Sequence, residues 1–246
     1  MKRTLDVLIA AVALLLLAPL FAVIAATVWL EDQRSPWFRG RRVGRGGQEF
    51  HMLKFRSMRP DAWRTGVNST AAGDVRITRV GRYLRAAKLD ELPQLWNVLI
   101  GEMSLVGPRP QVAADASLYT GKERRMLEVR PGITDLASIV FSDEGAILAG
   151  SADPDLLYNQ VIRPWKSRLA LLYLERGSWT TDLRVLLLTA GTLVSRRWAL
   201  EHVGNLLEAW GVGEPLASMA RRDRPLMPYP PPGAWEIVER YLVKTG

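Results

Sequence analysis

Two adjacent carboxylates, Asp90 and Glu91, are the residues of this chain whose type and spacing most directly suggest chemistry. Carboxylates can act as nucleophiles, and they are ligands for hard cations such as Mg²⁺. Both precede Pro93, a residue well suited to the first position of a helix. Acids in that place often do no more than complement the helix dipole, so a catalytic role has to be argued from their surroundings.

The segment that follows the two acids has the pattern of a short helix. Apolar residues recur at the three-four spacing of a buried stripe, at Leu92, Leu95, Trp96 and Leu99. Gly101 follows as a stop signal. The pattern therefore predicts that Asp90 and Glu91 lie at the N-terminus of a helix, with their side chains near its positive end.

The charge around this segment favours phosphate as the ligand. The chain of 246 residues has 33 Lys and Arg against 25 Asp and Glu, a net charge of +8. The excess is regional, because fourteen basic residues and three acids lie between Arg34 and Lys88. A basic region of this kind suits nucleic acid, anionic lipid or a phosphorylated substrate.

The composition narrows the metals that the protein could use. The chain has no cysteine and only two histidines, His51 and His202, which excludes a disulfide framework and a Cys-based zinc site. We therefore expect any metal to be a hard cation held by carboxylates.

The N-terminus contains an apolar run from Val7 to Leu30, without a charged residue. As a helix it would be roughly 36 Å long, enough to cross a bilayer core, and it is long for a cleaved signal peptide. A single span and a re-entrant helix both fit this length. Pro19 in the middle favours a kink, and basic residues flank both ends, which favours a helix that returns to the cytoplasmic side.

The remaining chain reads as a small, mainly helical α+β domain. Residues 37–55 predict a β-hairpin with its turn at the glycine-rich stretch 43–47. Residues 169–174 and 183–194 predict helices that are either core helices or amphipathic helices on the membrane interface. We divide the chain into a membrane helix (1–33), a catalytic domain (34–195) and a C-terminal extension of open role (196–246).

Five short segments, taken in order and spacing, resemble the bacterial sugar transferase family of monotopic phosphoglycosyl transferases. They are 54–58 (KFRSM), 79–85 (RVGRYLR), 89–98 (LDELPQLWNV), 101–110 (GEMSLVGPRP) and 131–134 (PGIT). The resemblance covers about residues 4–195, and the apolar run with Pro19 matches the re-entrant membrane helix of that family. Two positions depart from its pattern, Gly40 in place of a common glutamine and Asp135 in place of a common glycine.

The resemblance implies transfer of a sugar 1-phosphate from a UDP-sugar to polyprenyl (undecaprenyl) phosphate, which gives polyprenyl diphosphate sugar and UMP. It implies a covalent phosphosugar intermediate on Asp90, with Glu91 helping to hold Mg²⁺ or Mn²⁺. The phosphate-binding residues of the family map onto Lys54, Arg85 and Arg109, and we add Arg56 from the first motif.

The resemblance also implies a place in the cell and a set of partners. We expect a monotopic protein of the bacterial inner membrane with its active site facing the cytoplasm, acting in the first membrane step of glycoconjugate or exopolysaccharide assembly. Its partners would be the two substrates and membrane lipid but no nucleic acid, and a homodimer stays open.

The residue chemistry agrees with this assignment. An aspartate is ionised at neutral pH and needs no base to attack, but it needs cations to offset the repulsion from a diphosphate. Two alternatives stay open. One is a membrane-anchored adaptor whose basic region binds lipid or nucleic acid. The other is a transferase in which Asp90 and Glu91 only bind Mg²⁺ and the acceptor attacks directly.

Overall fold

The computed structural model of the protein describes residues 2–65, 67 and 69–240. Its helices are α1 (Lys2–Asp32), α2 (Arg79–Ala86), α3 (Gln94–Ile100), α4 (Ala113–Ser117), α5 (Leu136–Val140), α6 (Glu144–Leu148), α7 (Pro154–Leu157), α8 (Arg163–Arg176), α9 (Trp179–Thr192), α10 (Arg196–Ala209) and α11 (Leu216–Arg221). The strands are β1 (Trp37–Val43), β2 (Glu49–Phe55), β3 (Ser104–Val106) and β4 (Gly132–Thr134). The mainly helical fold and the small hairpin were predicted.

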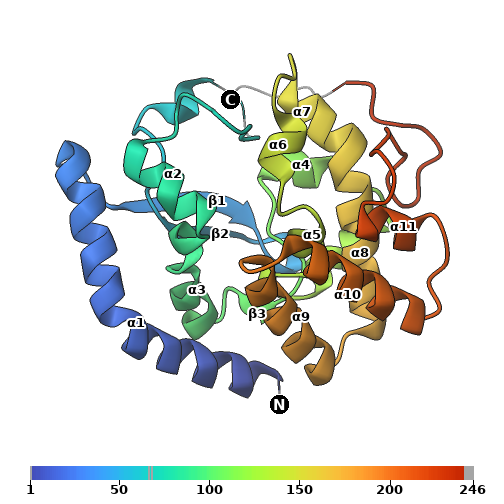
Figure 1. Ribbon diagram of the computed structural model, residues 1–246, viewed down its shortest axis with the longest axis horizontal. Coiled ribbons are helices and arrows are strands. Elements are labelled where there is room, and N and C mark those ends of the chain that lie inside the picture. The colour runs from blue at the N-terminus through green and yellow to red at the C-terminus, as the bar shows by residue number, and fades with distance from the viewer. Residues whose placement is uncertain (1, 66, 68, 241–246) are drawn as a thin grey trace.

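Helix α1 is long and apolar enough to cross a membrane, with a mean hydropathy of 3.0 over its most apolar window. Figure 1 shows α1 in blue along one flank of the molecule, changing direction between its two halves. Only Asp6, Ala10, Ile24 and Val28 are buried on it. Its outward side exposes large apolar residues, among them Leu8, Leu15, Leu16 and Val23. Such a surface is unusual next to water and is typical of contact with lipid.

Both ends of α1 are held against the rest of the protein by polar contacts. At the N-terminal end, the Asp6 carboxylate accepts hydrogen bonds from the Ser104 hydroxyl (2.7 Å) and the Leu105 amide (3.3 Å). At the C-terminal end, Asp32 pairs with Arg56, and Glu31 accepts from the backbone amide of Arg79 (2.8 Å). Both ends of the helix are therefore fastened to the folded domain, and between them α1 packs along α3 (Figure 1).

Strands β1 and β2 form the predicted antiparallel hairpin, paired from Trp37–Phe55 to Val43–Glu49. The turn uses left-handed backbone at Gly46 and Gly47. Two further strands were not predicted, because β3 and β4 have only three residues each. They pair in parallel, and their close approach needs glycine: a Cβ on Gly132 would lie 2.1 Å from the Gly107 nitrogen.

The predicted buried stripe of α3 was partly wrong. Leu95 and Val98 are buried, but Trp96 is 49% exposed. The reason is Asn97, whose side chain accepts from the Leu53 amide (2.9 Å) and donates to the His51 carbonyl (2.8 Å). These bonds to β2 turn Asn97 inward, so Trp96 faces outward.

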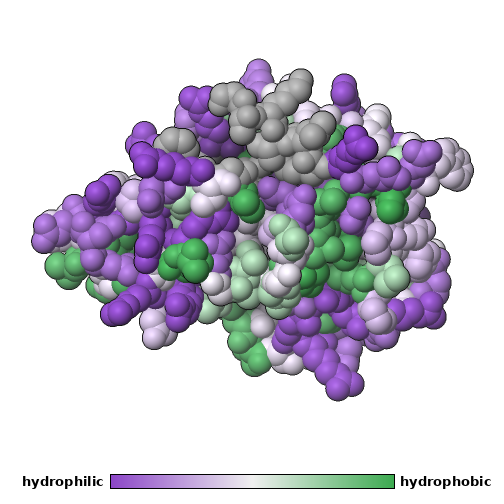
Figure 2. Space-filling view, turned by 90° about the horizontal axis from the view of Figure 1, so that it is seen from above, coloured by the Kyte–Doolittle hydropathy of each residue, from purple (hydrophilic) through white to green (hydrophobic). Residues whose placement is uncertain are grey.

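The main core lies among α5, α8, α9 and α10, to the right of the hairpin in Figure 1. Helices α9 and α10 begin at serine caps, Ser178 and Ser195, whose side chains accept from the amides of Thr181 and Trp198. The face seen from above in Figure 2 is largely hydrophilic on its left side, where the C-terminal end of α1 and α2 lie.

Candidate active site

Asp90 and Glu91 lie in a single 3-10 turn (Leu89–Glu91) between α2 and α3. They precede α3 as predicted, although Pro93 is the cap and the first helical residue is Gln94. The turn is entered through Lys88, whose backbone is left-handed (φ 58°). Helix α2 in turn is capped by Thr78 and packs so closely on the 54–58 motif that a Cβ on Gly81 would lie 2.0 Å from the Ser57 carbonyl oxygen.

Glu91 is the anion of a three-residue ionic cluster. Its Oε1 accepts hydrogen bonds from Lys54 Nζ (2.9 Å) and Arg109 Nη2 (2.6 Å), and its Oε2 accepts from Arg109 Nη1 (2.7 Å). Burial alone would raise the pKa of Glu91, but Arg109 and Lys54 outweigh it and hold that pKa well below its usual range. Burial alone would lower the pKa of Arg109, but the ion pair with Glu91 outweighs it and raises that pKa. All three side chains are about one fifth exposed.

Asp90 has a different environment, although it is the next-door neighbour. It is 4% exposed, and no hydrogen bond to its carboxylate is found in the described part of the chain. Burial raises its pKa, with Glu91 adding to the effect, while the charges of Lys54, Arg85 and Lys88 act in the opposite sense. One carboxylate is thus fixed between cations, and the other keeps its oxygens available among cations.

Arg109 reaches this cluster because of the parallel strands. It lies in the loop that follows β3, and its guanidinium also donates to the Ile133 carbonyl of β4. Asp135, one of the departures noted above, follows β4 and caps α5 by accepting from the Ser138 amide (2.6 Å). Its charge also raises the pKa of Arg109, so the acid reinforces the cationic state of the arginine.

The structure brings together most of the predicted site residues but not all. Lys54, Arg109 and, through its charge, Arg85 act on the two acids. Arg56 does not join them, because its guanidinium binds the Asp32 carboxylate (2.5 and 2.6 Å) and donates to the Ser35 carbonyl. It fastens the end of α1, and its predicted contact with phosphate has no support in this geometry.

Two cations that the sequence did not single out also belong to this region. Lys88 acts on the pKa of Asp90, and the charge of Arg42 on β1 is coupled to Arg109 and Glu91. Burial lowers the pKa of Arg42, and the nearby Arg109 lowers it further. Both lie in the basic stretch between Arg34 and Lys88, but their sequence neighbours gave no reason to choose them over the other arginines.

Whether Asp90 and Glu91 can hold a metal ion depends on Glu91, because its carboxylate is bound to Lys54 and Arg109. Among the described residues no group of three or more His, Asp or Glu side chains could hold a metal. Mg²⁺ usually takes one or two carboxylates and completes its shell with phosphate oxygens and water. Asp90 and Glu91 fit an ion that arrives with a diphosphate, provided that phosphate replaces the carboxylate as a partner of Lys54 or Arg109.

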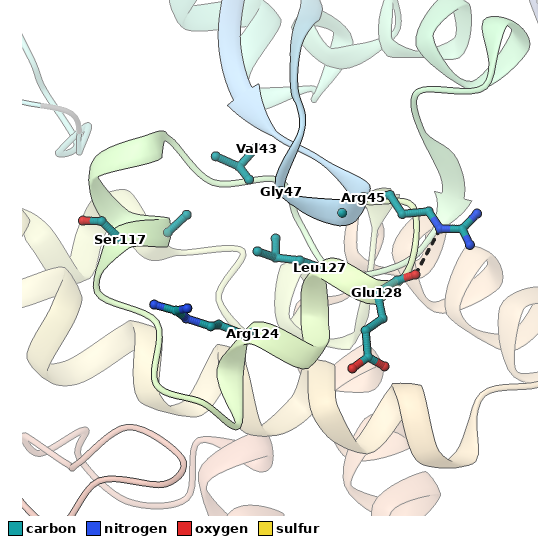
Figure 3. Close-up of a pocket in the computed structure, with 9 residues that line it drawn as sticks. Val43, Arg45, Gly47, Ser117, Arg124, Leu127 and Glu128 are labelled. Carbon is teal, nitrogen blue, oxygen red and sulfur yellow. Dashed lines mark hydrogen bonds between the residues drawn. The ribbon is translucent and has the colours of Figure 1, made fainter.

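A cavity of about 540 Å³ lies elsewhere, between the hairpin turn and the segment 113–128. Figure 3 shows Arg45 at one edge, where it donates to the Glu128 carbonyl, and Arg124 on the other side. None of the predicted site residues lines it. The candidate active site is therefore defined by its charges and not by this cavity.

Comparison with known proteins gives a family and named relatives. Residues 1–196 match the family model described as bacterial sugar transferase. A UDP-glucose:undecaprenyl-phosphate glucose-1-phosphate transferase of Caulobacter vibrioides is 37% identical over 79% of this chain and 70% of its own length. The exopolysaccharide production protein ExoY of Rhizobium meliloti is 44% identical over 56% of this chain and 68% of its own length.

A third relative differs in the sugar that its name gives. The UDP-N-acetylgalactosamine-undecaprenyl-phosphate N-acetylgalactosaminephosphotransferase of Aeromonas hydrophila is 40% identical over 56% of this chain. The match covers only 34% of that protein's length.

Proposed function

The chain belongs to the bacterial sugar transferase family, and on this premise we propose that it is a phosphoglycosyl transferase that moves a sugar 1-phosphate from a UDP-sugar to undecaprenyl phosphate. The three relatives described above are named for that kind of reaction or for exopolysaccharide production. Their names differ in the sugar, so the proposal covers the nucleotide and the lipid carrier and leaves the sugar unspecified.

The observation that carries the proposal is the unequal environment of the two acids. A nucleophile needs an uncommitted lone pair, and Asp90 has a carboxylate without a hydrogen-bond partner in the described residues. Glu91 has both oxygens bound by Lys54 and Arg109. We therefore assign attack to Asp90 and the fixing of the phosphate-binding cations to Glu91.

The proposed reaction has two displacements at one phosphorus atom. A carboxylate oxygen of Asp90 attacks the β-phosphorus of the UDP-sugar, the bond to the bridging oxygen breaks, and UMP leaves with the electron pair. A phosphate oxygen of the lipid then attacks the same phosphorus and releases the Asp90 carboxylate. Neither step requires a proton transfer from Asp90, so the absence of cysteine and the scarcity of histidine do not obstruct it.

The surrounding cations lower the cost of bringing a carboxylate to a diphosphate. Arg109 can bind two phosphate oxygens at once, and Lys54 adds a point charge beside it. Mg²⁺, with Glu91 among its ligands, would supply further neutralisation of the diphosphate. Asp90 is nearly excluded from water, so each of these charges acts on it more strongly than it would in solvent.

We further propose that α1 enters the cytoplasmic leaflet, bends at Pro19 and returns. Support comes from the two ends, which both bind the folded domain through charged residues: Asp6 contacts β3, and Asp32 contacts Arg56. A straight crossing would place one of these polar contacts on the far side of the membrane from the domain. A proline inside the helix supplies a physical cause for the bend.

Helix α9 is proposed to rest on the membrane interface beside α1. Trp179, Leu183 and Leu187 follow one another at four-residue spacing and are 63%, 51% and 61% exposed. The first turn of α9 is tied to the N-terminal end of α1 by an ion pair between Asp182 and Lys2. In this arrangement the active site faces the cytoplasm, and the membrane is the bacterial inner membrane.

The proposal is tested by adding a UDP-sugar and Mg²⁺ to the purified protein without lipid acceptor. We expect a burst of UMP equal in amount to the active protein with at least one UDP-sugar. Steady transfer without any burst would support direct attack by the acceptor and refute the covalent step. A protein that binds anionic lipid but releases no UMP with any UDP-sugar would support the adaptor alternative.

The topology needs a separate experiment, which the cysteine-free chain makes simple. Single cysteines at Thr4 and at Gln33 are labelled with a membrane-impermeant reagent in sealed vesicles of known orientation. A re-entrant helix predicts labelling of both positions from the same side. Labelling from opposite sides would contradict the proposed topology without touching the proposed chemistry.

A further inference from the structure

Two cations beside Asp90 lack the acidic partner that the other two have. Lys54 and Arg109 are both bound to Glu91. Arg85 and Lys88 act on the pKa of Asp90, but neither forms an ion pair within residues 2–65, 67 and 69–240. Arg85 and Lys88 are therefore the cations next to Asp90 that have no acidic partner among these residues, and both lie on the α2 side of the site.

The backbone of Lys88 is the second observation. Its φ and ψ of 58° and 18° lie in the left-handed region, which L-residues with a side chain rarely adopt. Its amide donates to the Arg85 carbonyl (3.2 Å), so the left-handed residue closes α2 and directs the chain into the turn with Asp90. Glycine or asparagine would fit this position with less strain, and a lysine there is more typical of a functional site.

The location of these cations relative to the membrane helix is the third observation. Leu84, the residue before Arg85, packs in one buried cluster with Ile24 and Val28 of α1. Helix α2 therefore packs on the second half of α1 (Figure 1), and so do Phe55 at the end of β2 and Leu89 and Leu92 around the Asp90 turn. A lipid whose chain stays in the bilayer brings its phosphate to the membrane surface, close to this helix.

From these observations we infer that Lys88, beside Arg85, which the family resemblance already assigns to phosphate, binds the phosphate monoester of the lipid acceptor. The inference rests on the proposed function and deepens it. In the second displacement, a lipid phosphate oxygen forms a bond to the phosphorus held on Asp90, and the bond from that phosphorus to the Asp90 oxygen breaks. Burial lowers the pKa of Lys88, and the charges of Glu91 and Asp90 oppose that effect. In its cationic form Lys88 attracts the incoming phosphate and offsets the repulsion between two phosphates.

The test is the variant Lys88→Gly, because glycine accepts the left-handed backbone and so removes the charge without adding strain. We expect the Tm of this variant to be unchanged or raised. The amplitude of the UMP burst at saturating UDP-sugar, without lipid, should stay within about twofold of the wild type. The KM for undecaprenyl phosphate should rise about tenfold, a change of about 1.4 kcal/mol in binding.

Two further variants separate the charge of Lys88 from other effects. Lys88→Arg keeps the charge and should restore most of the affinity for the lipid phosphate. Arg82→Ala removes an exposed cation one turn before Arg85 on the same helix, and should leave the KM for the lipid within about twofold. An equal rise in that KM for Arg82→Ala would mean general attraction to anionic lipid and would overturn the assignment.

The remaining outcomes are also decisive. A Lys88→Gly protein with an unchanged KM for the lipid overturns the inference. A burst that is lost in parallel with turnover also overturns it, because Lys88 would then act on the UDP-sugar. Both outcomes presuppose a wild-type burst. If the wild type gives no burst with any UDP-sugar, the covalent step of the proposed function fails, and the assignment of Lys88 to the second displacement fails with it.

Discussion

Replacing Glu91 by glutamine should lower the stability of the protein substantially, because two cations would lose their shared anion. The structure gives three hydrogen bonds to this carboxylate, two from Arg109 and one from Lys54, at 2.6–2.9 Å. Breaking a largely buried ion pair by removing one partner costs about 3–5 kcal/mol, and the amide of glutamine still accepts one bond. We therefore expect a loss of about 2–4 kcal/mol, which corresponds to a decrease in Tm of roughly 4–16 °C for a chain of this size.

The pH dependence gives an independent check of the same reasoning. The pKa of Glu91 is lower in the folded than in the unfolded protein, so its stabilising effect is full above the unfolded value of about 4.3. The effect is lost as the pH falls through the folded pKa. The difference in Tm between wild type and Glu91→Gln should therefore be greatest near neutral pH and should shrink in acid.

The assay is thermal unfolding of the protein in detergent or nanodiscs, followed by tryptophan fluorescence at several pH values. Glu201→Gln is the matched control, because Glu201 also pairs with an arginine but more than half of its side chain is exposed. The control should change the Tm by no more than about 2 °C. If Glu91→Gln shifts the Tm no more than the control does, the ionic cluster does not stabilise the fold and the reasoning is refuted.

Three further predictions follow from the same contacts. Asp90→Asn should abolish both turnover and the UMP burst while raising the Tm. Burial raises the pKa of Asp90, so its charge destabilises the fold as the pH rises through the pKa of the folded protein. Residual turnover above about 1% or a lower Tm would contradict this prediction. Arg109→Ala should raise the KM for the UDP-sugar about tenfold or more and lower the Tm, and an unchanged KM would remove Arg109 from phosphate binding. Arg56→Ala should lower the Tm while leaving the KM for the UDP-sugar within about twofold, and a tenfold rise would return Arg56 to the phosphate site.

The sequence predicted the elements around the site because their signals are local. Glycines mark the hairpin turn, and Pro93 and the stop glycine Gly101 bound α3. Strands β3 and β4 could not be found this way, since three residues give no alternating pattern. Their pairing depends on a contact between Gly107 and Gly132, which are far apart in the chain, and that contact brings Arg109 to Glu91.

The ion-pair partner of each charged side chain could likewise not be predicted from the sequence. Lys54 and Arg56 are two residues apart in one motif, and simple alternation would place them on the same face. Strand β2 ends at Phe55, however, so Arg56 lies beyond the paired region, and its amide donates to the Pro36 carbonyl. It therefore turns to Asp32 at the end of α1, while Lys54 stays on the strand and binds Glu91.

The C-terminal end of the family match, residue 196, does not coincide with the end of the folded unit. Helix α10 begins there, and Val203 and Leu207 are completely buried in the main core. Farther along, Arg222 of the extension binds Asp143, the residue before α6, and Asp143 also binds Arg196.

The last part of the extension packs on α8 and on the segment before it. The Tyr229 ring packs on Trp165 of α8 with centroids 4.4 Å apart, and its amide donates to the Gln160 carbonyl. A segment that fills the core and holds α6 and α8 cannot be removed without exposing apolar surface. Residues 196–240 therefore belong to the same folded unit as the active site, although residues beyond 196 lie outside the match to the family.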